Sequence, residues 1–246
     1  YLGILVDSNN VLVKKSPLRW QKIRQAINYG FDRKKLMLYL RNSIGTAANS
    51  GFIPLGMPSF DSSVVKGYHY DPDKARKLLL EAGFSGGNNL PTIKLLTIPN
   101  YADLAGYIAN ELNLIGIPIQ VEVVQKSILL EQTSKSQALF FRGSWIADYP
   151  DAENYLSVFY GKNPAPPNYT RYKNSLYDVL YEKSLAEKND TLRYKLYQQM
   201  DKLIIEDAPI VPLWYDMAIH LVHSNIKNFP PNSLNLLELR RTKKTP

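Results

Sequence analysis

The chain has 246 residues, 45% of them hydrophobic and 21% charged, which is typical of a folded chain with a packed core. It contains no cysteine, and this excludes a disulfide scaffold, a thiolate nucleophile and a cysteine-based metal site. The formal net charge is +8, but half of the excess comes from four residues near the end of the chain, Arg240, Arg241, Lys243 and Lys244. No nucleic-acid-binding motif accompanies this charge, so we expect no nucleic-acid partner. No stretch approaches the roughly 20 apolar residues of a membrane-spanning helix.

Local sequence signals predict a hairpin, the start of a helix and a long loop within residues 1–62. Residues 1–13 contain two apolar runs separated by the polar residues 7–10, a pattern that predicts a β-hairpin. Ser16 followed by Pro17 predicts the N-cap and the first position of a helix. Residues 45–62 are rich in Gly, Pro, Ser and Asn, which indicates a long loop.

The clearest helix of the sequence begins near residue 72. Asp71 is a good N-cap, Pro72 fits the first helical position, and Asp73 complements the helix dipole. The apolar residues repeat at helical spacing and form one face, namely Ala75, Leu78, Leu79 and Ala82. Gly83 then provides a left-handed C-terminal stop.

A strand–helix–strand pattern indicates the fold class. We predict a strand at 92–98, a helix at about 103–115 and a second strand at 117–124, whose apolar residues alternate with polar ones. Pro118 places the second strand at a sheet edge or marks its start. Two strands joined by a helix at this spacing are expected to be parallel, with a right-handed crossover. The fold class is therefore α/β.

The second half of the chain continues this alternation of elements. In chain order we predict a helix at 127–134, a strand at 138–142, two helices within 175–206 and strands within 210–239 that are broken at 225–233. Asp190 is the expected N-cap of the last helix, and Pro209 ends it. The apolar face of that helix is expected to comprise Leu192, Leu196, Met200 and Leu203.

Three groups of residues raise alternative functions. His220 and His223 could suggest a metal site, but three apart on a predicted strand they face opposite sides, so we expect no metal. Asp148 and Asp151 could form a glycosidase pair, although the sequence does not fix their separation. No catalytic triad, phosphate loop or deaminase signature is present, so we expect neither an enzyme nor a cofactor. Tyrosines could stack on sugars, but most are expected to pack beside leucines on helices, namely Tyr172, Tyr177, Tyr181, Tyr194 and Tyr197.

Five segments together resemble the family 5 solute-binding proteins, the oligopeptide-, dipeptide- and nickel-binding receptors of bacterial ABC importers. In chain order they are RQAIN (24–28) with DR (32–33), YDPDKARKLLLEAG (70–83), LNLIGI (112–117), WIADYPD (145–151) and DAPIVPL (207–213). Each segment alone is weakly specific. Their common order and spacing over nearly the whole chain make the resemblance specific.

The resemblance implies the second lobe of a periplasmic-binding-protein type II fold, with a mixed sheet and flanking helices. It implies the substrate-binding component of an ABC importer, a monomer that closes two lobes on a peptide and delivers it to a membrane permease. Such a protein is periplasmic or lies on the cell surface as an anchored lipoprotein. Residues 1–221 would form the ligand-binding lobe, and residues 222–246 would return to the N-terminal lobe. Because the chain begins at Tyr1 without a signal segment, we expect that lobe and an export signal upstream.

The resemblance also implies three ligand-binding residues. Asp148 matches an aspartate that pairs with the α-amino group of bound peptides, and it follows a predicted strand, where open α/β sheets bind ligands. The alternative is that Asp148 caps a turn or the helix beginning near Ala152. Trp145 would form a wall of the pocket, or else pack in the core. Arg142 matches an arginine that faces the ligand in some oligopeptide-binding members, or else is a solvated or ion-paired strand residue.

One residue of the ligand-binding segment departs from the family pattern. Ser144 stands where the family commonly has glycine before the tryptophan, and its hydroxyl would narrow the pocket or add a hydrogen bond. The ligand class therefore stays open between peptides and the family's other solutes, which are oligosaccharides, opines and metal chelates. A glycosidase-like enzyme is the remote alternative.

Overall fold

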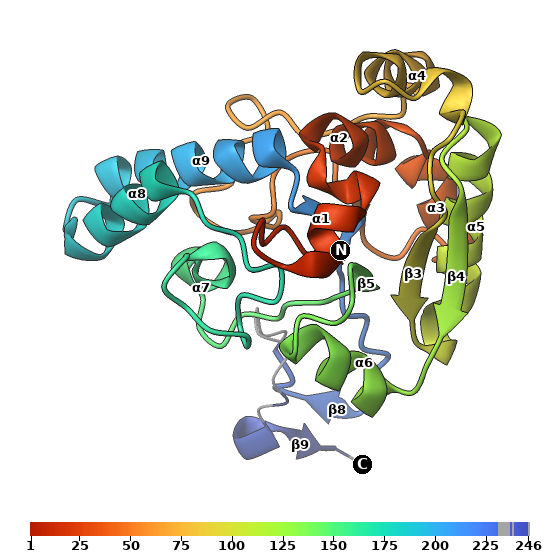
Figure 1. Ribbon diagram of the computed structural model, residues 1–246. Coiled ribbons are helices and arrows are strands. Elements are labelled where there is room, and N and C mark those ends of the chain that lie inside the picture. Colours follow the sequence, from red (N-terminus) through yellow and green to blue (C-terminus); the bar gives the residue numbers. More distant parts are fainter. Residues whose placement is uncertain (231–236, 238, 246) are drawn as a thin grey trace.

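The computed structural model describes residues 1–230, 237 and 239–245. A mixed five-stranded sheet lies at its centre, and helices flank it (Figure 1). The strands, in spatial order, are β4 (Ile119–Val123), β3 (Ile93–Thr97), β5 (Phe140–Arg142), β1 (Leu2–Ile4) and β6 (Ile210–Val211). β3 pairs in parallel with both β4 and β5, whereas β1 runs antiparallel to β5 and β6. The predicted α/β class and mixed sheet are confirmed.

The strand–helix–strand unit forms as the sequence predicts. Helix α5 (Ala102–Leu114) connects β3 to β4, and Ile93 pairs with Ile119 at the start of the parallel ladder. β4 is the outermost strand of the sheet, the position that Pro118 indicates. Gly116 has a φ of +92°, a left-handed conformation that glycine adopts without strain as the chain turns from α5 into β4.

The predicted N-terminal hairpin is wrong. The turn at residues 7–10 forms, but helix α1 (Val11–Lys15) follows it in place of a second strand. The Asn10 side chain accepts a hydrogen bond from the Leu12 backbone N–H and caps this helix. The apolar residues 1–6 do contain a buried strand, β1, which is why their pattern suggested a hairpin. The partners of this strand are β5 and β6, which lie far away in the sequence.

The helix expected after Ser16 begins later than predicted. The Ser16 hydroxyl accepts a hydrogen bond from the Leu18 N–H, but it caps only a single 3-10 turn, η1 (Pro17–Arg19). Helix α2 (Gln21–Tyr29) starts after Trp20, and α3 (Arg33–Leu40) follows with Asp32 as its N-cap. The cap and the proline therefore have the local roles that the sequence indicates, in a shorter element.

Two buried arginines join the first of the five sequence segments to the last. Arg24 donates hydrogen bonds to the backbone carbonyls of Asp207 and Ala208. Arg33, of which 2% is exposed, donates to the carbonyls of Pro212 and Asn28 and to the Asn28 side chain. Since each guanidinium satisfies several carbonyls, α2 and the start of α3 are fixed to residues 207–212, which include β6. These two segments have a structural role.

Helix α4 (Pro72–Glu81) forms at the predicted boundaries. The Asp71 carboxylate accepts a hydrogen bond from the Lys74 N–H at 2.9 Å, and Gly83 has a φ of +90° just beyond the helix. The predicted apolar face packs against α2, with Ala75 and Leu79 fully buried. A 3-10 turn, η2 (Ser85–Gly87), leads from there into β3.

Removal of the α4 cap is expected to destabilise the protein modestly. Asp71→Ala leaves the Lys74 N–H without its acceptor and should lower the free energy of unfolding by about 1 kcal/mol. Asp73→Ala is the matched control, because Asp73 lies in the same helical turn and makes only an exposed ion pair with Arg76. Urea unfolding measures both variants, and an equal loss in both would show that the cap contributes nothing specific.

A second core, rich in aromatic residues, lies beyond the sheet. Its helices are α7 (Glu153–Leu156), α8 (Ser175–Ala186) and α9 (Asp190–Asp207), with the 3-10 turn η4 (Ser157–Phe159). Four of the five singled-out tyrosines are buried here and Tyr194 is partly buried, which confirms their packing role. The predicted cap of α9 is wrong, because Asn189 accepts the Leu192 N–H while Asp190 pairs with Arg193. The predicted apolar face is also shifted, since Leu192 is exposed and Tyr197 is buried.

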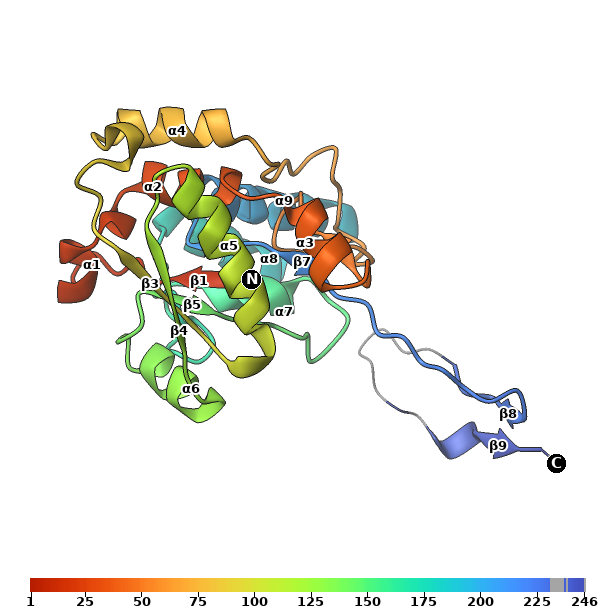
Figure 2. The ribbon, with the colours of Figure 1, turned by 90° about the vertical axis from the view of Figure 1, so that its right-hand side faces the viewer.

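The remaining elements complete the body and a C-terminal extension. Helix α6 (Lys126–Ser134) lies near its expected position, and the 3-10 turn η3 (Pro99–Tyr101), which was not predicted, precedes α5. β2 (Thr46–Ala47) pairs with β7 (Trp214–Tyr215), so the predicted long loop begins with a short strand. Beyond residue 216, β8 (Ile226–Lys227) pairs with β9 (Lys243–Lys244), next to η5 (Leu239–Arg241). Figure 2 shows these strands extending away from the body.

His220 and His223 do not lie on a strand, so the argument from opposite strand faces is wrong. The His220 ring lies edge-on to Phe229, and His223 Nδ1 lies 2.8 Å from the Asn225 side-chain oxygen. Among residues 1–230, 237 and 239–245, no group of three His, Asp or Glu side chains forms a possible metal site.

Candidate functional site

One edge of the sheet collects the carboxyl ends of β3, β5 and β6. Because β1 is antiparallel to its neighbours, Tyr1, the residue before β1, also lies at this edge. The Gly143 N–H donates to the Tyr1 carbonyl at 2.9 Å, directly where β5 ends. Parallel strands commonly bind ligands at this edge. All three predicted site residues lie on or just after β5, at this end.

The segment after β5 contains Trp145 and Asp148 but neither helix nor strand between residues 143 and 151. Asp148 is exposed, and none of the described residues forms a hydrogen bond or ion pair with its carboxylate. Its backbone N–H donates to Asn154 Oδ1 at 3.3 Å. The alternative of Asp148 as a side-chain cap therefore has no hydrogen bond in the described part of the chain. The carboxylate is accessible to an external cation.

Trp145 is half-buried at the edge of the second core. Its indole N–H donates to Asn154 Oδ1 at 2.8 Å, and its ring packs against the aromatic cluster. One part of the side chain therefore belongs to the core, as the alternative reading holds, while the other part remains accessible. Asn154, which joins Trp145 to Asp148, is a residue that the sequence analysis did not single out.

Asp151 has a structural role. One of its carboxylate oxygens accepts hydrogen bonds from the Glu153 N–H and the Tyr197 hydroxyl, both at 2.9 Å. The other oxygen lies 3.1 Å from the Arg193 guanidinium. Asp151 thus holds α7 against α9, and these contacts leave it poorly suited to act as the catalytic partner of Asp148.

Arg142 belongs to a separate cluster at the same edge. Its guanidinium lies 3.7 Å from the centre of the Tyr101 ring, and burial lowers its pKa. Among the described residues Arg142 Nε has no hydrogen-bond partner, and no hydrogen bond or ring contact joins Arg142 to Trp145 or Asp148. The centres of the Tyr101 and Trp214 rings lie 6.3 Å apart. The Arg41 guanidinium lies 4.9 Å from the centre of the Trp214 ring. The cluster is rich in aromatic surface and positive charge.

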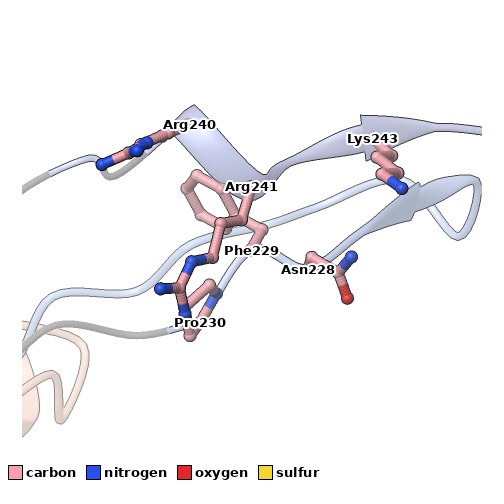
Figure 3. Close-up of a pocket in the computed structure, with 6 residues that line it drawn as sticks. All are labelled: Asn228, Phe229, Pro230, Arg240, Arg241 and Lys243. Atoms are coloured by element: carbon pink, nitrogen blue, oxygen red, sulfur yellow. The ribbon is translucent and has the colours of Figure 1, made fainter.

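Surface cavities also occur away from this edge. One of about 820 Å³ lies in the C-terminal extension, and Figure 3 shows Arg241 beside Phe229 and Pro230 there. Arg240 and Lys243 also line it, so it is positively charged. It contains none of the three predicted site residues.

Of the helices in the described ranges, none combines the length and the hydrophobicity that a bilayer crossing requires.

This mixed sheet with flanking helices has the fold of a lobe of the periplasmic-binding-protein type II class. Residues 5–167 match the model of the bacterial extracellular solute-binding proteins, family 5 (middle). The chain therefore belongs to this family.

Several curated relatives resemble most of the chain. Heme-binding protein A of Haemophilus influenzae is 28% identical over 88% of this chain and 40% of its own length. Dipeptide-binding protein DppE of Bacillus subtilis is 25% identical over 93% of this chain and 43% of its own length. The chain thus spans less than half of the length of these relatives.

A solved structure of the same class matches the fold closely. It is the periplasmic binding protein DppA from Helicobacter pylori in complex with the peptide STSA, with a TM-score of 0.82. The match covers 99% of this chain and 46% of that one, at 22% identity. The similarity shows the fold, and the predicted type II lobe is confirmed.

Proposed function

We propose that this chain is the C-terminal lobe of an extracytoplasmic receptor that binds peptides for an ABC importer. The observation that carries the proposal is the accessible carboxylate of Asp148, in the segment that follows β5 and also contains the half-buried Trp145. Family membership supports the role, and the names of several relatives support peptides as the ligand.

In this proposal Asp148 pairs with the α-amino group of the peptide. A carboxylate binds an ammonium through charge-assisted hydrogen bonds that do not depend on the peptide's side chains. The exposed part of the Trp145 ring covers the first side chain by surface contact, which accepts many shapes. Arg142, whose guanidinium lies over the Tyr101 ring at the same edge, would donate to an acceptor of the ligand. A second lobe would close over these groups and exclude water.

The remaining features of the proposal follow from the family. The receptor binds without catalysing a reaction, works as a monomer and delivers its ligand to a membrane permease. Its place is the periplasm or the cell surface, where a lipid anchor would retain it. The contacts of Asp151 weaken the glycosidase alternative, because that carboxylate already holds α7 and α9 together.

The experiment that tests the proposal is mass spectrometry of the ligand released from the purified receptor, followed by calorimetry. Peptides with a free amino group should bind with one-to-one stoichiometry. The competing candidate is another solute of the family, for which the similarity to heme-binding protein A provides a specific case, a metal chelate. Release of heme or an oligosaccharide, together with no heat from peptides, would replace the peptide proposal by this alternative.

We also propose that residues 222–246 form a segment separate from the ligand-binding lobe of residues 1–221. The basis is that β8 and β9 pair with each other and extend from the body (Figure 2). In a two-lobed receptor this segment would pack on the other lobe.

A chain that ends at residue 221 is expected to keep its stability. Its free energy of unfolding should lie within about 1 kcal/mol of that of the whole chain, because the removed strands contribute no partner to the central sheet. A chain that ends at residue 209 is the control, since it lacks β6 and should not fold cooperatively. Urea unfolding followed by circular dichroism measures all three. A large loss on ending at 221 would place the segment in the lobe.

A further inference from the structure

The relative position of Trp145 and Asp148 needs a cause outside the sheet. β5 ends at Arg142, and residues 144–150 have no helical or strand hydrogen bonds of their own. A segment of this kind has many conformations of similar energy unless side chains fix it. Yet a pocket that binds an ammonium and the adjacent side chain needs both groups at a set separation.

Asn154 provides the fixing contacts. Its Oδ1 accepts from the Trp145 indole N–H at 2.8 Å and from the Asp148 backbone N–H at 3.3 Å. Both of these groups can only donate, so the atom on which they converge must be the amide oxygen and not the nitrogen. Asn154 is 5% exposed, so the acceptor of both bonds is buried, while the donors lie on the half-buried Trp145 and the exposed Asp148.

Asn154 is itself held by the second core. Its backbone N–H donates to the Asp151 carbonyl at 3.2 Å, and its carbonyl accepts from the Ser157 hydroxyl at 2.8 Å. Asp151 is fixed to α9 by Tyr197 and Arg193. A chain of contacts therefore runs from the long helix α9 through Asp151 to Asn154, and from there to the exposed segment.

We propose that Asn154 is a positioning residue, which sets the Trp145 ring and the Asp148 backbone at a fixed separation before the ligand arrives. It does not touch the ligand. The role deepens the proposed function and rests on it, since the groups that it positions are the proposed peptide-binding groups. Preorganisation of this kind strengthens binding because less freedom is lost when the complex forms.

The test compares two variants of Asn154 with a control variant of another asparagine. Asn154→Leu has a similar volume but no acceptor, whereas Asn154→Asp keeps an acceptor oxygen. Asn163→Leu is the matched control, because the Asn163 side chain binds the Ser157 carbonyl near the same helix but makes no bond to residues 144–150. Asn154→Ser, whose hydroxyl is too short for both donors, replaces the leucine variant if that protein does not fold.

The first readout is the indole ¹H–¹⁵N signal of Trp145 in the ligand-free chain, assigned with Trp145→Phe among the signals of three tryptophans. The leucine variant should move this signal towards that of a water-bonded indole, and the aspartate variant should restore it. The second readout is calorimetry with trialanine on the receptor that contains both lobes. Affinity should fall at least about tenfold in Asn154→Leu, recover in Asn154→Asp and stay unchanged in Asn163→Leu.

Each outcome has a separate meaning. An unmoved indole signal in Asn154→Leu, or an affinity that does not fall when the signal moves, would overturn the positioning role. Failure of wild-type receptor to bind trialanine would overturn the proposed peptide function. The indole signal is measured without ligand, so it distinguishes these two failures.

Discussion

Replacement of Asp148 by Asn in the receptor that contains both lobes is expected to weaken peptide binding by about two to three decades. The amide keeps the shape of the carboxylate but removes the charge that balances the peptide ammonium. In a closed site that ion pair is shielded from water, and loss of one partner costs about 3–5 kcal/mol. An exposed aspartate without a ligand role would cost well under about 1 kcal/mol. Calorimetry with a free-amine peptide measures the difference.

Two controls isolate the contribution of the ammonium. N-acetylation of the peptide should weaken binding to the wild type strongly and binding to Asp148→Asn much less. Asp73→Asn removes the same charge from an exposed position on α4 and should bind like the wild type. If Asp148→Asn also binds like the wild type, Asp148 is not the anchor, and the cluster of Arg142 and Tyr101 becomes the next candidate.

A second large effect is expected from Asp201, a buried carboxyl group on α9. Asp201 is 2% exposed and accepts hydrogen bonds from the Phe52 N–H at 2.6 Å and the Ile53 N–H at 3.3 Å. It thereby fixes the loop at 45–62 to the helix. Burial disfavours the charged form and raises the pKa of Asp201 to about 7, although the two backbone bonds oppose this shift.

The raised pKa makes stability fall as pH rises. In the unfolded chain the carboxyl group ionises near its ordinary pKa of 3.8, so between about pH 4 and pH 7 only the unfolded state loses the proton. The contribution is fully present below pH 3.8 and is lost as pH rises through about 7, a loss of about 4 kcal/mol. Tyr177 and Tyr215 are nearby titratable groups, and burial raises the pKa of each further above its ordinary value, so neither ionises in this window.

Asp201→Asn tests this expectation, because an amide cannot ionise but keeps an acceptor for the Phe52 N–H. The variant should lose most of this group's pH dependence and should be more stable than the wild type at pH 8. Asp178→Asn is the matched control, since Asp178 also accepts a backbone N–H, from Gly161, but is only half-buried. Urea unfolding at pH 4.5, 6 and 8 gives the comparison. Parallel pH curves for wild type and Asp201→Asn would contradict the expectation.

Local sequence signals predicted the elements whose stabilising contacts are local. Helix α4 has its cap, its proline and its terminal glycine within the helix itself, and its boundaries were predicted correctly. The unit of β3, α5 and β4 was also predicted, because its strands are consecutive. β1 was assigned to a hairpin, because no local signal reveals that its partners lie in distant segments.

Some residues of the candidate site could likewise be found from the sequence, and one could not. Trp145 and Asp148 were found through the resemblance of their segment to a family, and their role stays a prediction. Asn154 was missed because an asparagine in the first turn of a short helix has no distinctive spacing. Its two hydrogen-bond donors come from an irregular segment, and only the folded geometry brings them to one oxygen. A search for buried amides beside the family segment could have raised it as a candidate.

The place of β1 between β5 and β6 has a consequence for the order in which the chain folds. Leu2 pairs with both Arg142 and Val211, so β1 is flanked on both sides only after Val211 has been made. β3, α5 and β4 can pack together earlier, since their contacts join residues that are close in the sequence. Contacts between distant residues form slowly, and until they form β1 remains an unpaired apolar strand. During synthesis this strand is therefore exposed to aggregation until its partner strands have been made.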